Sequence, residues 1–254
     1  MPVPNTNSFN LQDVTKEIYG SSIVTGNLSK CFTDATGTFD ATYVGSKNGL
    51  LNFRNYVQIF STGYGFLYNW YTVEVDSRNI APLGWHVPTT AEWTTLINYL
   101  GGDYVAGYKL TETGLTHWNS PNSNATNSSG FSGRGGGKRG IDGYYSGYRT
   151  GALFWSTTSV GNNGGIIVVG NDLSNGYVII ASNAKAEGSS IRCIKDNSVN
   201  NGSVTDIDGN IYSTVSIGTQ VWMASNLKVS RYRDGTAIPN VKDSVLWGAL
   251  ITGG

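Results

Sequence analysis

The stretch "GWHVPTTAEWTTLINYLGG", residues 84–102, contains the strongest helix signal in the chain. Thr89 followed by Glu92 is a capping box, in which the threonine side chain accepts from the Glu92 amide and the glutamate reaches back to the Thr89 amide. Two glycines, 101 and 102, are typical of a helix end. Between them lie apolar residues at the spacing of one helical face: Trp93, Leu96, Ile97 and Leu100. The stretch predicts a helix and a structural role for Glu92.

The histidine of this stretch, His86, lies between Trp85 and Val87 on a segment flanked by Pro82 and Pro88. A catalytic role is the alternative, because a glutamate and two tryptophans are close in sequence. We favour a partly buried histidine whose ring nitrogens are hydrogen-bonded. The stretch is therefore expected to build the fold rather than to perform chemistry.

Composition excludes several classes of partner. The chain has 254 residues, enough for one large domain or two modest ones, and a formal charge of zero with 17 basic residues. It lacks the excess of basic residues that nucleic acids and anionic membranes attract. A glycine count of 34 and an aromatic content of 12% favour a loop-rich β or α+β fold over a helical bundle.

Export and membrane signals are missing from the sequence. "MPVPNTNSFNLQDV" has neither the basic nor the apolar region of a secretory signal, and no apolar run approaches the roughly 20 residues that span a bilayer. For the two cysteines, Cys31 and Cys193, we favour unpaired buried thiols over a disulfide. We expect a chain made in a cytoplasm, without membrane insertion.

Residues 1–60 form the first of three segments. "SFNLQDVTKEIYG" predicts a short helix with an apolar face, and "GNLSKCFTDATG" is a second candidate helix. The apolar residues of these two helices are Leu11, Val14, Ile18, Leu28, Cys31 and Phe32. The segment is too small to bury much core alone. We interpret it as a helical adaptor for attachment or oligomerisation.

Residues 61–196 form the main body, and the polar residues 197–203 link it to a third segment, 204–254. The third segment predicts short strands separated by turns. The turn signals are Asp208-Gly209, Gly218-Thr219 and Asp234-Gly235. A piece of this size without cysteines needs another surface to complete its core.

Known catalytic and metal motifs are missing. The two histidines, His86 and His117, stand in no zinc motif, and "GRGGGKRG" at 133–140 lacks the spacing of a phosphate loop. "DIDGN" at 206–210 has the alternating acids of a calcium loop but no distal glutamate, so a hairpin turn is the simpler interpretation. We expect no metal and no cofactor.

A series of motifs follows through the main body in a characteristic order: "YGFLYNWYTV", "GWHVPTTAEWTTLINYLGG", "KLTETGLTHWNSPNSNATNSSGFSGRGGGKRG", "FWSTTS" and "IRCIKD". Together they resemble the FISUMP family, the "major paralogous domain" group of C-type-lectin-like modules. The resemblance covers nearly all of 61–196. It implies an α+β domain with a small twisted antiparallel sheet, two helices and long loops that present a binding face. The family has a similar Gly-Gly-x-Arg turn at Gly136, Gly137 and Arg139. We interpret Arg139 as a structural residue that ties loops together, and ligand binding is the alternative.

This chain departs from the family pattern in two ways. The family usually has a cysteine at Ala81, and that cysteine is expected to pair with Cys193. Family members also begin with a segment like 206–240, which here comes last. Either 204 begins a truncated second copy, or 204–230 completes the first copy by docking beside 189–196. Such docking, in the same chain or from a neighbouring copy, would cover a bare strand edge.

Two activities of related modules are not expected. Calcium-dependent sugar binding in lectin-like domains uses Glu-Pro-Asn, Gln-Pro-Asp and Trp-Asn-Asp triplets, none of which occurs here. The distantly similar formylglycine-generating enzymes use paired cysteines, whereas the main body has Cys193 alone. An oxidase is therefore the weakest of the alternatives.

The expected binding face consists of the loops between Gly140 and Gly188. Apolar segments between these loops, "IIVV" and "YVII", predict buried strands that support them. Ordinary solvated turns are the alternative for any single residue. The candidate ligand-binding residues are Tyr144, Tyr145, Tyr148, Arg149, Asn162, Asn163, Asn171, Asp172, Asn175, Tyr177, Asn183 and Lys185. Asn-rich loops also suit the diversified region of lectin-like variable proteins.

Residues 1–60 resemble a module at the start of structural proteins in phages of gut Bacteroidota, through "LQDV", "CFTDA" and "LLNFRNY". We therefore expect a non-enzymatic virion or fibre protein, assembled in the host cytoplasm and released by lysis. Residues 1–60 would bind other virion proteins. The lectin-like face of a homo-oligomer would bind host-surface glycan or protein with avidity. A bacterial surface or secreted adhesin is the alternative.

Overall fold

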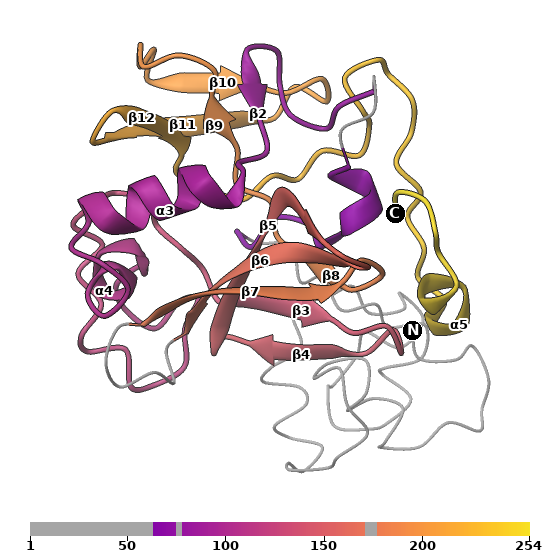
Figure 1. Ribbon diagram of the computed structural model, residues 1–254, viewed down its shortest axis with the longest axis horizontal. Coiled ribbons are helices and arrows are strands. Elements are labelled where there is room, and N and C mark those ends of the chain that lie inside the picture. Colours follow the sequence, from indigo (N-terminus) through magenta and orange to yellow (C-terminus); the bar gives the residue numbers. More distant parts are fainter. Residues whose placement is uncertain (1–62, 75–77, 171–176) are drawn as a thin grey trace, which may run out of the picture.

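The computed structural model describes residues 63–74, 78–170 and 177–254. The two helices expected within 1–60 lie outside the described residues. The described part is a mixed α+β structure dominated by sheets, with short helices (Figure 1). The helices are the 3-10 helix η3 (Trp70–Thr72), α3 (Thr90–Tyr99), α4 (Ala106–Leu110) and α5 (Ser244–Gly248).

The larger sheet of the described residues has seven strands, in the order β1-β8-β3-β5-β6-β7 with β4 paired to β3. Its strands are β1 (Tyr68–Asn69), β3 (Gly136–Arg139), β4 (Tyr145–Tyr148), β5 (Gly151–Val160), β6 (Asn163–Gly170), β7 (Val178–Ala184) and β8 (Gly188–Ser189). All pairings are antiparallel except β3 with β5, where Gly137 is opposite Ala152. The ladder between β5 and β6 is interrupted by a register shift between Trp155 and Ser159.

The smaller sheet of the described residues joins the main body to the C-terminal segment. Its order is β10-β11-β12-β9-β2, and it lies at the top of Figure 1. The strands are β2 (Trp85–His86), β9 (Ile194–Lys195), β10 (Ser203–Thr205), β11 (Ile211–Ile217) and β12 (Gln220–Met223). Trp222 of β12 is opposite Ile194 of β9. The expected contact between 204–230 and 189–196 is thus present within this chain.

The predicted helix is α3, and its capping box is present. The Thr89 hydroxyl accepts from the Glu92 amide at 3.2 Å, and the Glu92 carboxylate accepts from the Thr89 amide at 2.8 Å. Trp93 and Leu96 have no exposed surface. The capping residues and the apolar stripe therefore determine both where the helix begins and which face it buries.

Two predicted turns separate the strands of the C-terminal segment. Gly209 (φ 82°) and Gly218 (φ 61°) have the left-handed backbone that a glycine accepts without strain, and they precede β11 and β12 respectively. Asp206 begins the first turn, because its carboxylate accepts the amides of Asp208 and Asn210 at 2.9 Å and the Tyr212 hydroxyl at 2.6 Å. "DIDGN" is thus a hairpin turn, as expected.

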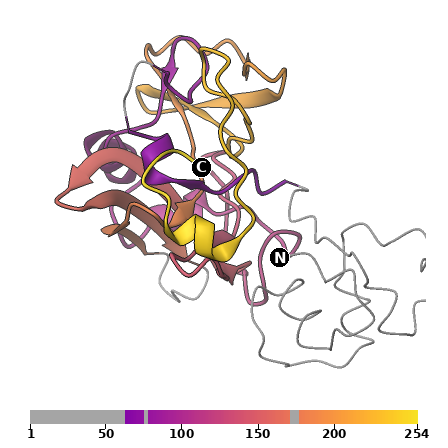
Figure 2. The ribbon, with the colours of Figure 1, turned by 90° about the vertical axis from the view of Figure 1, so that its right-hand side faces the viewer.

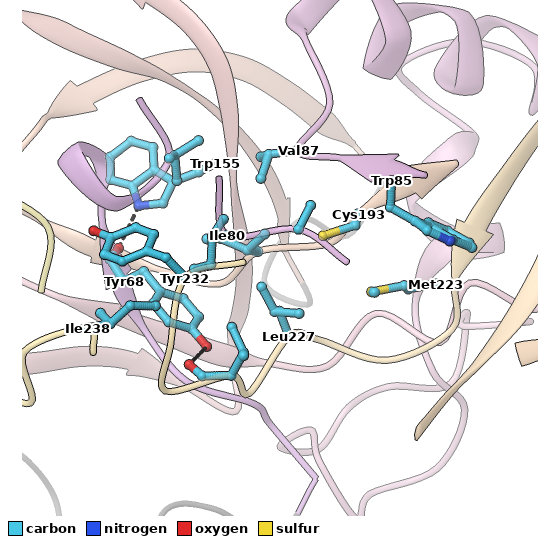
Figure 3. Packing of buried hydrophobic residues seen from close by; sticks show 14 of the residues in the cluster. Tyr68, Ile80, Trp85, Val87, Trp155, Cys193, Met223, Leu227, Tyr232 and Ile238 are labelled. Atoms are coloured by element: carbon cyan, nitrogen blue, oxygen red, sulfur yellow. Dashed lines mark hydrogen bonds between the residues drawn. The ribbon is translucent and has the colours of Figure 1, made fainter. Parts of the chain in front are cut away.

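Both hydrophobic clusters of the described residues contain side chains from the main body and from the C-terminal segment. Figure 3 shows the first of them, where Met223, Leu227 and Tyr232 pack with Ile80 and Cys193. The Trp155 indole donates to the Tyr68 carbonyl oxygen at 2.7 Å. Figure 2 shows the C-terminal segment running from the smaller sheet down the side of the molecule to α5. The two segments share one core.

In the second cluster, four aromatic side chains from four separate parts of the chain lie close to one another. Trp93 of α3 has its ring 4.6 Å from that of Trp222 and 5.5 Å from that of Phe154, and Phe131 lies 5.6 Å from Phe154. The Arg192 guanidinium lies over the Phe131 ring at 4.1 Å. Because α3, β5 and β12 each supply one of these rings, the cluster ties the helix to both sheets.

Arg192 is fully buried without a carboxylate partner among the described residues. Its guanidinium donates to the Asn226 amide oxygen at 2.6 and 3.1 Å, to the Met223 carbonyl at 3.0 Å and to the carbonyls of Phe131 and Ser132. Burial lowers the pKa of Arg192 from 12.5 to about 9. Carbonyl and amide oxygens and aromatic rings among the described residues therefore stabilise this positive charge without a carboxylate.

The expectation of a buried strand at "YVII" is wrong for most of its residues. In β7 only Val178 is buried, whereas Ile179 and Ile180 are 44% and 39% exposed. The reason is topological, because β7 is the edge strand of the larger sheet and pairs with β6 alone. The "IIVV" strand, β6, lies inside the sheet, and Ile166, Ile167 and Val169 are fully buried as predicted.

Cys193 is an unpaired, fully buried thiol in the first cluster. Burial in apolar surroundings raises its pKa well above the ordinary value of 9.0. Ala81, where the family pattern has a cysteine, is buried in the same cluster. Cys31 lies outside the described residues. In the described part of the chain, no helix combines the length and apolarity needed to cross a bilayer.

Removal of the C-terminal segment tests the shared core. We expect a chain ending at residue 203 to lose cooperative unfolding, because both clusters lose buried side chains. A separate peptide of residues 204–254, added in trans, should restore a cooperative transition measured by thermal unfolding. A truncated chain that unfolds at the temperature of the full chain would contradict a shared core.

Replacement of Arg192 tests the buried charge. Arg192→Met keeps the volume but leaves several buried oxygens without donors, so we expect a loss of about 3 kcal/mol in the free energy of unfolding. The matched control is Arg231→Met, because the half-exposed Arg231 pairs with Asp208 at 2.6 Å. This surface pair should contribute less than about 1 kcal/mol. Urea unfolding of both variants gives the comparison, and equal losses would refute the special role of Arg192.

Candidate functional site

The candidate site is a cavity of about 450 Å³ at the junction of the main body and the C-terminal segment. We call it the aromatic cavity. Three parts of the chain line it: residues 64–68, strands β3 and β4, and residues of the C-terminal segment between 229 and 254. Its aromatic lining residues are Tyr64, Phe66, Tyr68, Tyr145, Tyr148 and Trp247. A volume of this order is typical of small-molecule sites.

Strand pairing positions the aromatic residues of β4. Tyr148 is opposite Gly136, and Tyr145 is opposite Arg139. The Tyr148 ring lies 5.2 Å from that of Tyr64. Gly137, at φ 64°, allows this pairing, because a side chain there would lie 2.3 Å from the Ser146 carbonyl oxygen. The hairpin therefore needs a glycine at this position to bring both tyrosines to the cavity.

Arg139 joins β3 to the C-terminal segment. It is 5% exposed, and its guanidinium donates to the carbonyls of Gly143 at 3.0 Å, Val241 at 2.5 Å and Lys242 at 2.9 Å. It also lies 4.3 Å from the centre of the Trp247 ring. Burial lowers the pKa of Arg139. The structural role expected for Arg139 is thus confirmed, and it fixes one wall of the cavity.

The predicted binding residues fall in separate places. Tyr145 and Tyr148 line the aromatic cavity, and Tyr144 beside them is 40% exposed. The Arg149 guanidinium donates to the carbonyls of Leu115 and Trp118, so it ties two loops together. Three of the predicted residues, Asn171, Asp172 and Asn175, lie outside the described residues.

The remaining predicted residues lie at the two ends of β7. Asn162 lies in the turn before β6, and Asn163, the first residue of β6, is opposite Ala184. Asn183 donates to Glu187 at 2.8 Å, and the Lys185 ammonium lies 4.0 Å from the centre of the Trp70 ring. Tyr177 precedes β7, and its ring lies 4.5 Å from that of Tyr104. The length of β7, roughly 20 Å, separates Tyr177 from this group.

The cavity contains residues that sequence reasoning missed. Phe66, Tyr68, Asn240, Lys242 and Trp247 were not among the expected binding residues. Asn240, Lys242 and Trp247 reach the cavity because the C-terminal segment folds back beside β3, a contact of high sequence separation. Residues 64–73 belong to the motif "YGFLYNWYTV". No local pattern in this motif distinguishes residues of a cavity wall from residues of the core.

His86 is held between two carboxylates. Its Nδ1 lies 2.6 Å from Asp196, and its Nε2 lies 2.8 Å from Glu92. The hydrogen bonds to Glu92 and Asp196 raise the pKa of His86 despite partial burial. Burial alone would raise the pKa of Glu92, but the hydrogen bonds from His86 and Thr89 outweigh it and lower the pKa to about 2. The satisfied histidine expected from the sequence is confirmed.

Glu112, Arg134 and His117 form a cluster of ionisable side chains next to Tyr64. Glu112 accepts from Arg134 at 2.9 Å and lies 2.5 Å from the Nδ1 atom of His117. Arg134 also donates to the Gly63 carbonyl at 2.5 Å. The His117 ring packs edge-on against Tyr64 at 4.8 Å. This cluster positions Tyr64 at the cavity.

The lining of the aromatic cavity combines aromatic rings with a few polar side chains. Among the described residues that line it there is no histidine, cysteine, aspartate or glutamate side chain. The described part of the chain also contains no group of three or more His, Cys, Asp or Glu residues that could hold a metal. Aromatic walls with a few polar groups are typical of ligand-binding pockets.

The fold and the site thus define a sheet-dominated α+β protein with an aromatic cavity. The chain belongs to the Fibrobacter succinogenes major domain family, whose model matches residues 15–195. The match begins inside the segment that we interpreted as an adaptor and ends before the C-terminal segment. No curated protein and no solved structure matches the chain.

The pH dependence of stability tests the environment of His86. The pKa of His86 in the folded chain is raised above 6.5. Its contribution to the free energy of unfolding is therefore present below pH 6.5 and is lost as the pH rises through the raised pKa. The contribution of Glu92 is present above pH 4.5 and is lost as the pH falls towards 2. Urea unfolding from pH 2 to 9 should show both losses.

His86→Gln should remove the loss of stability at alkaline pH and leave much of the loss at acid pH. A nuclear magnetic resonance titration of the imidazole measures the same pKa directly. A value at or below 6.5 in the folded chain would contradict the arrangement described.

Proposed function

We propose that this protein is a non-enzymatic structural protein of a phage virion, of the fibre type. In this proposal the described fold is C-type-lectin-like, and it displays a binding site for a glycan or protein on the host surface. Residues 1–60 attach the chain to other virion proteins, in line with the resemblance of "LQDV", "CFTDA" and "LLNFRNY" to phage modules. Several copies per particle would convert weak single contacts into avidity.

The observation that carries the proposal is the aromatic cavity, whose described lining contains no histidine, cysteine, aspartate or glutamate side chain. Tyrosine and tryptophan offer large contact areas at low entropic cost, so they are typical of binding surfaces. Arg139 holds the cavity walls through three carbonyl oxygens, and hairpin pairing holds the tyrosines. A preorganised site of this kind favours binding because little order is lost with the ligand.

An oxidase has less support than a binding protein. A thiol that performs redox chemistry is accessible and has a lowered pKa. Cys193 is instead fully buried, and burial raises its pKa. We therefore keep two binding functions, a virion protein and a bacterial adhesin, which differ in where the chain is found.

Labelling of purified phage particles with an antibody against the chain tests the location. We expect regularly placed label on the particles and none on uninfected cells. Label on the bacterial surface without particles would favour the adhesin and overturn the virion assignment.

Binding to the host surface is tested separately with the recombinant full chain. We expect saturable binding to host cells and at least tenfold tighter apparent binding when the chain is presented in many copies on beads. The matched control is heat-unfolded chain on the same beads. Absence of binding in both formats would refute the host-recognition role.

A further inference from the structure

Among the described residues that line the aromatic cavity, the charged side chains are basic. Arg139 and Lys242 line it, and no acidic side chain does. Two carboxylates lie close to these cations in sequence, and both accept backbone amides: Asp142 accepts from Tyr144 at 3.1 Å, and Asp243 accepts from Val245 and Leu246 at 2.9 Å. The cavity therefore favours a ligand with negative charge.

The two cations differ in what they can offer. The donors of Arg139 are occupied by backbone carbonyls, and the residue is buried. Lys242 is exposed at the cavity, and its ammonium has no hydrogen bond or ion pair within the described part of the chain. Arg139 thus supplies a fixed positive field, and Lys242 supplies the donor for an anionic group.

Two further polar side chains at the cavity have available hydrogen-bonding groups. Ser146 of β4 and Asn240 of the C-terminal segment line the cavity and are exposed. Within the described residues, neither side chain makes a hydrogen bond. The Gly254 carbonyl oxygen, which also lines the cavity, already accepts from the Asn69 amide at 3.0 Å. The site thus offers a hydroxyl, an amide and an ammonium beside aromatic walls.

We propose that the aromatic cavity binds an acidic sugar, a carboxylate-bearing unit of a surface glycan. The C–H faces of a sugar ring pack against the tyrosine and phenylalanine rings, and its hydroxyls bond Ser146 and Asn240. Its carboxylate pairs with Lys242. A bare anion would make no contact with the aromatic walls, and a neutral aromatic ligand would gain nothing from the exposed ammonium. This inference rests on the proposed binding function and names the ligand class of its site.

Calorimetric titration of the full chain with two disaccharides of the same linkage tests the inference. One contains glucuronic acid and the other contains glucose in its place. We expect the acidic sugar to bind about three- to tenfold tighter at low salt, and the difference to shrink as salt is added. Acetate is the third probe, and we expect it to bind more weakly than either disaccharide.

Two lysine variants locate the charge. Lys242→Gln keeps a polar side chain but removes the ammonium, so the preference for the acidic sugar should disappear while affinity for the neutral sugar is unchanged. Lys228→Gln is the matched control, because Lys228 is exposed but does not line the cavity. It should keep the preference. Equal affinity of the unmodified chain for both sugars, or an unchanged preference in Lys242→Gln, would overturn the inference.

Two aromatic variants locate the ring contacts. Tyr148→Leu and Phe66→Leu replace rings that are 39% and 42% exposed, so the fold should tolerate either change. Each should weaken the binding of both sugars about two- to tenfold, and a cooperative thermal transition of each variant checks that the fold is kept. Acetate binding as tight as that of the acidic disaccharide would indicate an anion site only and would refute a sugar site.

The two proposals fail differently. If the full chain binds host cells but neither disaccharide, the acidic-sugar assignment is wrong and the host-recognition function stands. If it binds the acidic disaccharide but no host cells, the cavity assignment stands and the function fails.

Discussion

The structure depends on a positive charge in its interior. The Arg192 guanidinium has no carboxylate partner in the described part of the chain, and it donates to backbone and amide oxygens from two segments, 131–132 and 223–226. Moving a charge out of water is costly unless its donors are satisfied, so these oxygens must all be in place at once. Since Met223 and Asn226 supply two of them, the main body is complete only with the C-terminal segment.

At the cavity, a second buried arginine is likewise bonded to backbone oxygens of the C-terminal segment. Arg139 bonds the carbonyls of residues 241 and 242 and stacks on Trp247, so it draws the end of the chain against β3. Arg192 bonds the C-terminal segment to the core, and Arg139 bonds the same segment to β3 at the aromatic cavity. A buried cation that needs several carbonyls specifies loop positions more narrowly than apolar packing does, because packing tolerates many arrangements of similar volume.

The features that local sequence predicts are those with local causes. The Thr89–Glu92 capping box, the glycine turns at 209 and 218 and the satisfied His86 depend on residues a few positions apart or on one recognisable motif. The cavity could not be predicted in this way, because Arg139 and the carbonyls of Val241 and Lys242, which join two of its walls, lie more than 100 residues apart in the sequence. The same reason explains the error at β7: "YVII" has the composition of an interior strand, but strand order decides its exposure.

The unpaired Cys193 has a consequence for where the fold can form. Its thiol is packed among apolar side chains, and alanine occupies position 81, so the first cluster is held by contact rather than by a covalent link. Formation of this core consumes no oxidant and is not reversed by glutathione or thioredoxin. The described part of the chain can therefore mature in a reducing cytoplasm and keep the same core after transfer to oxidising surroundings.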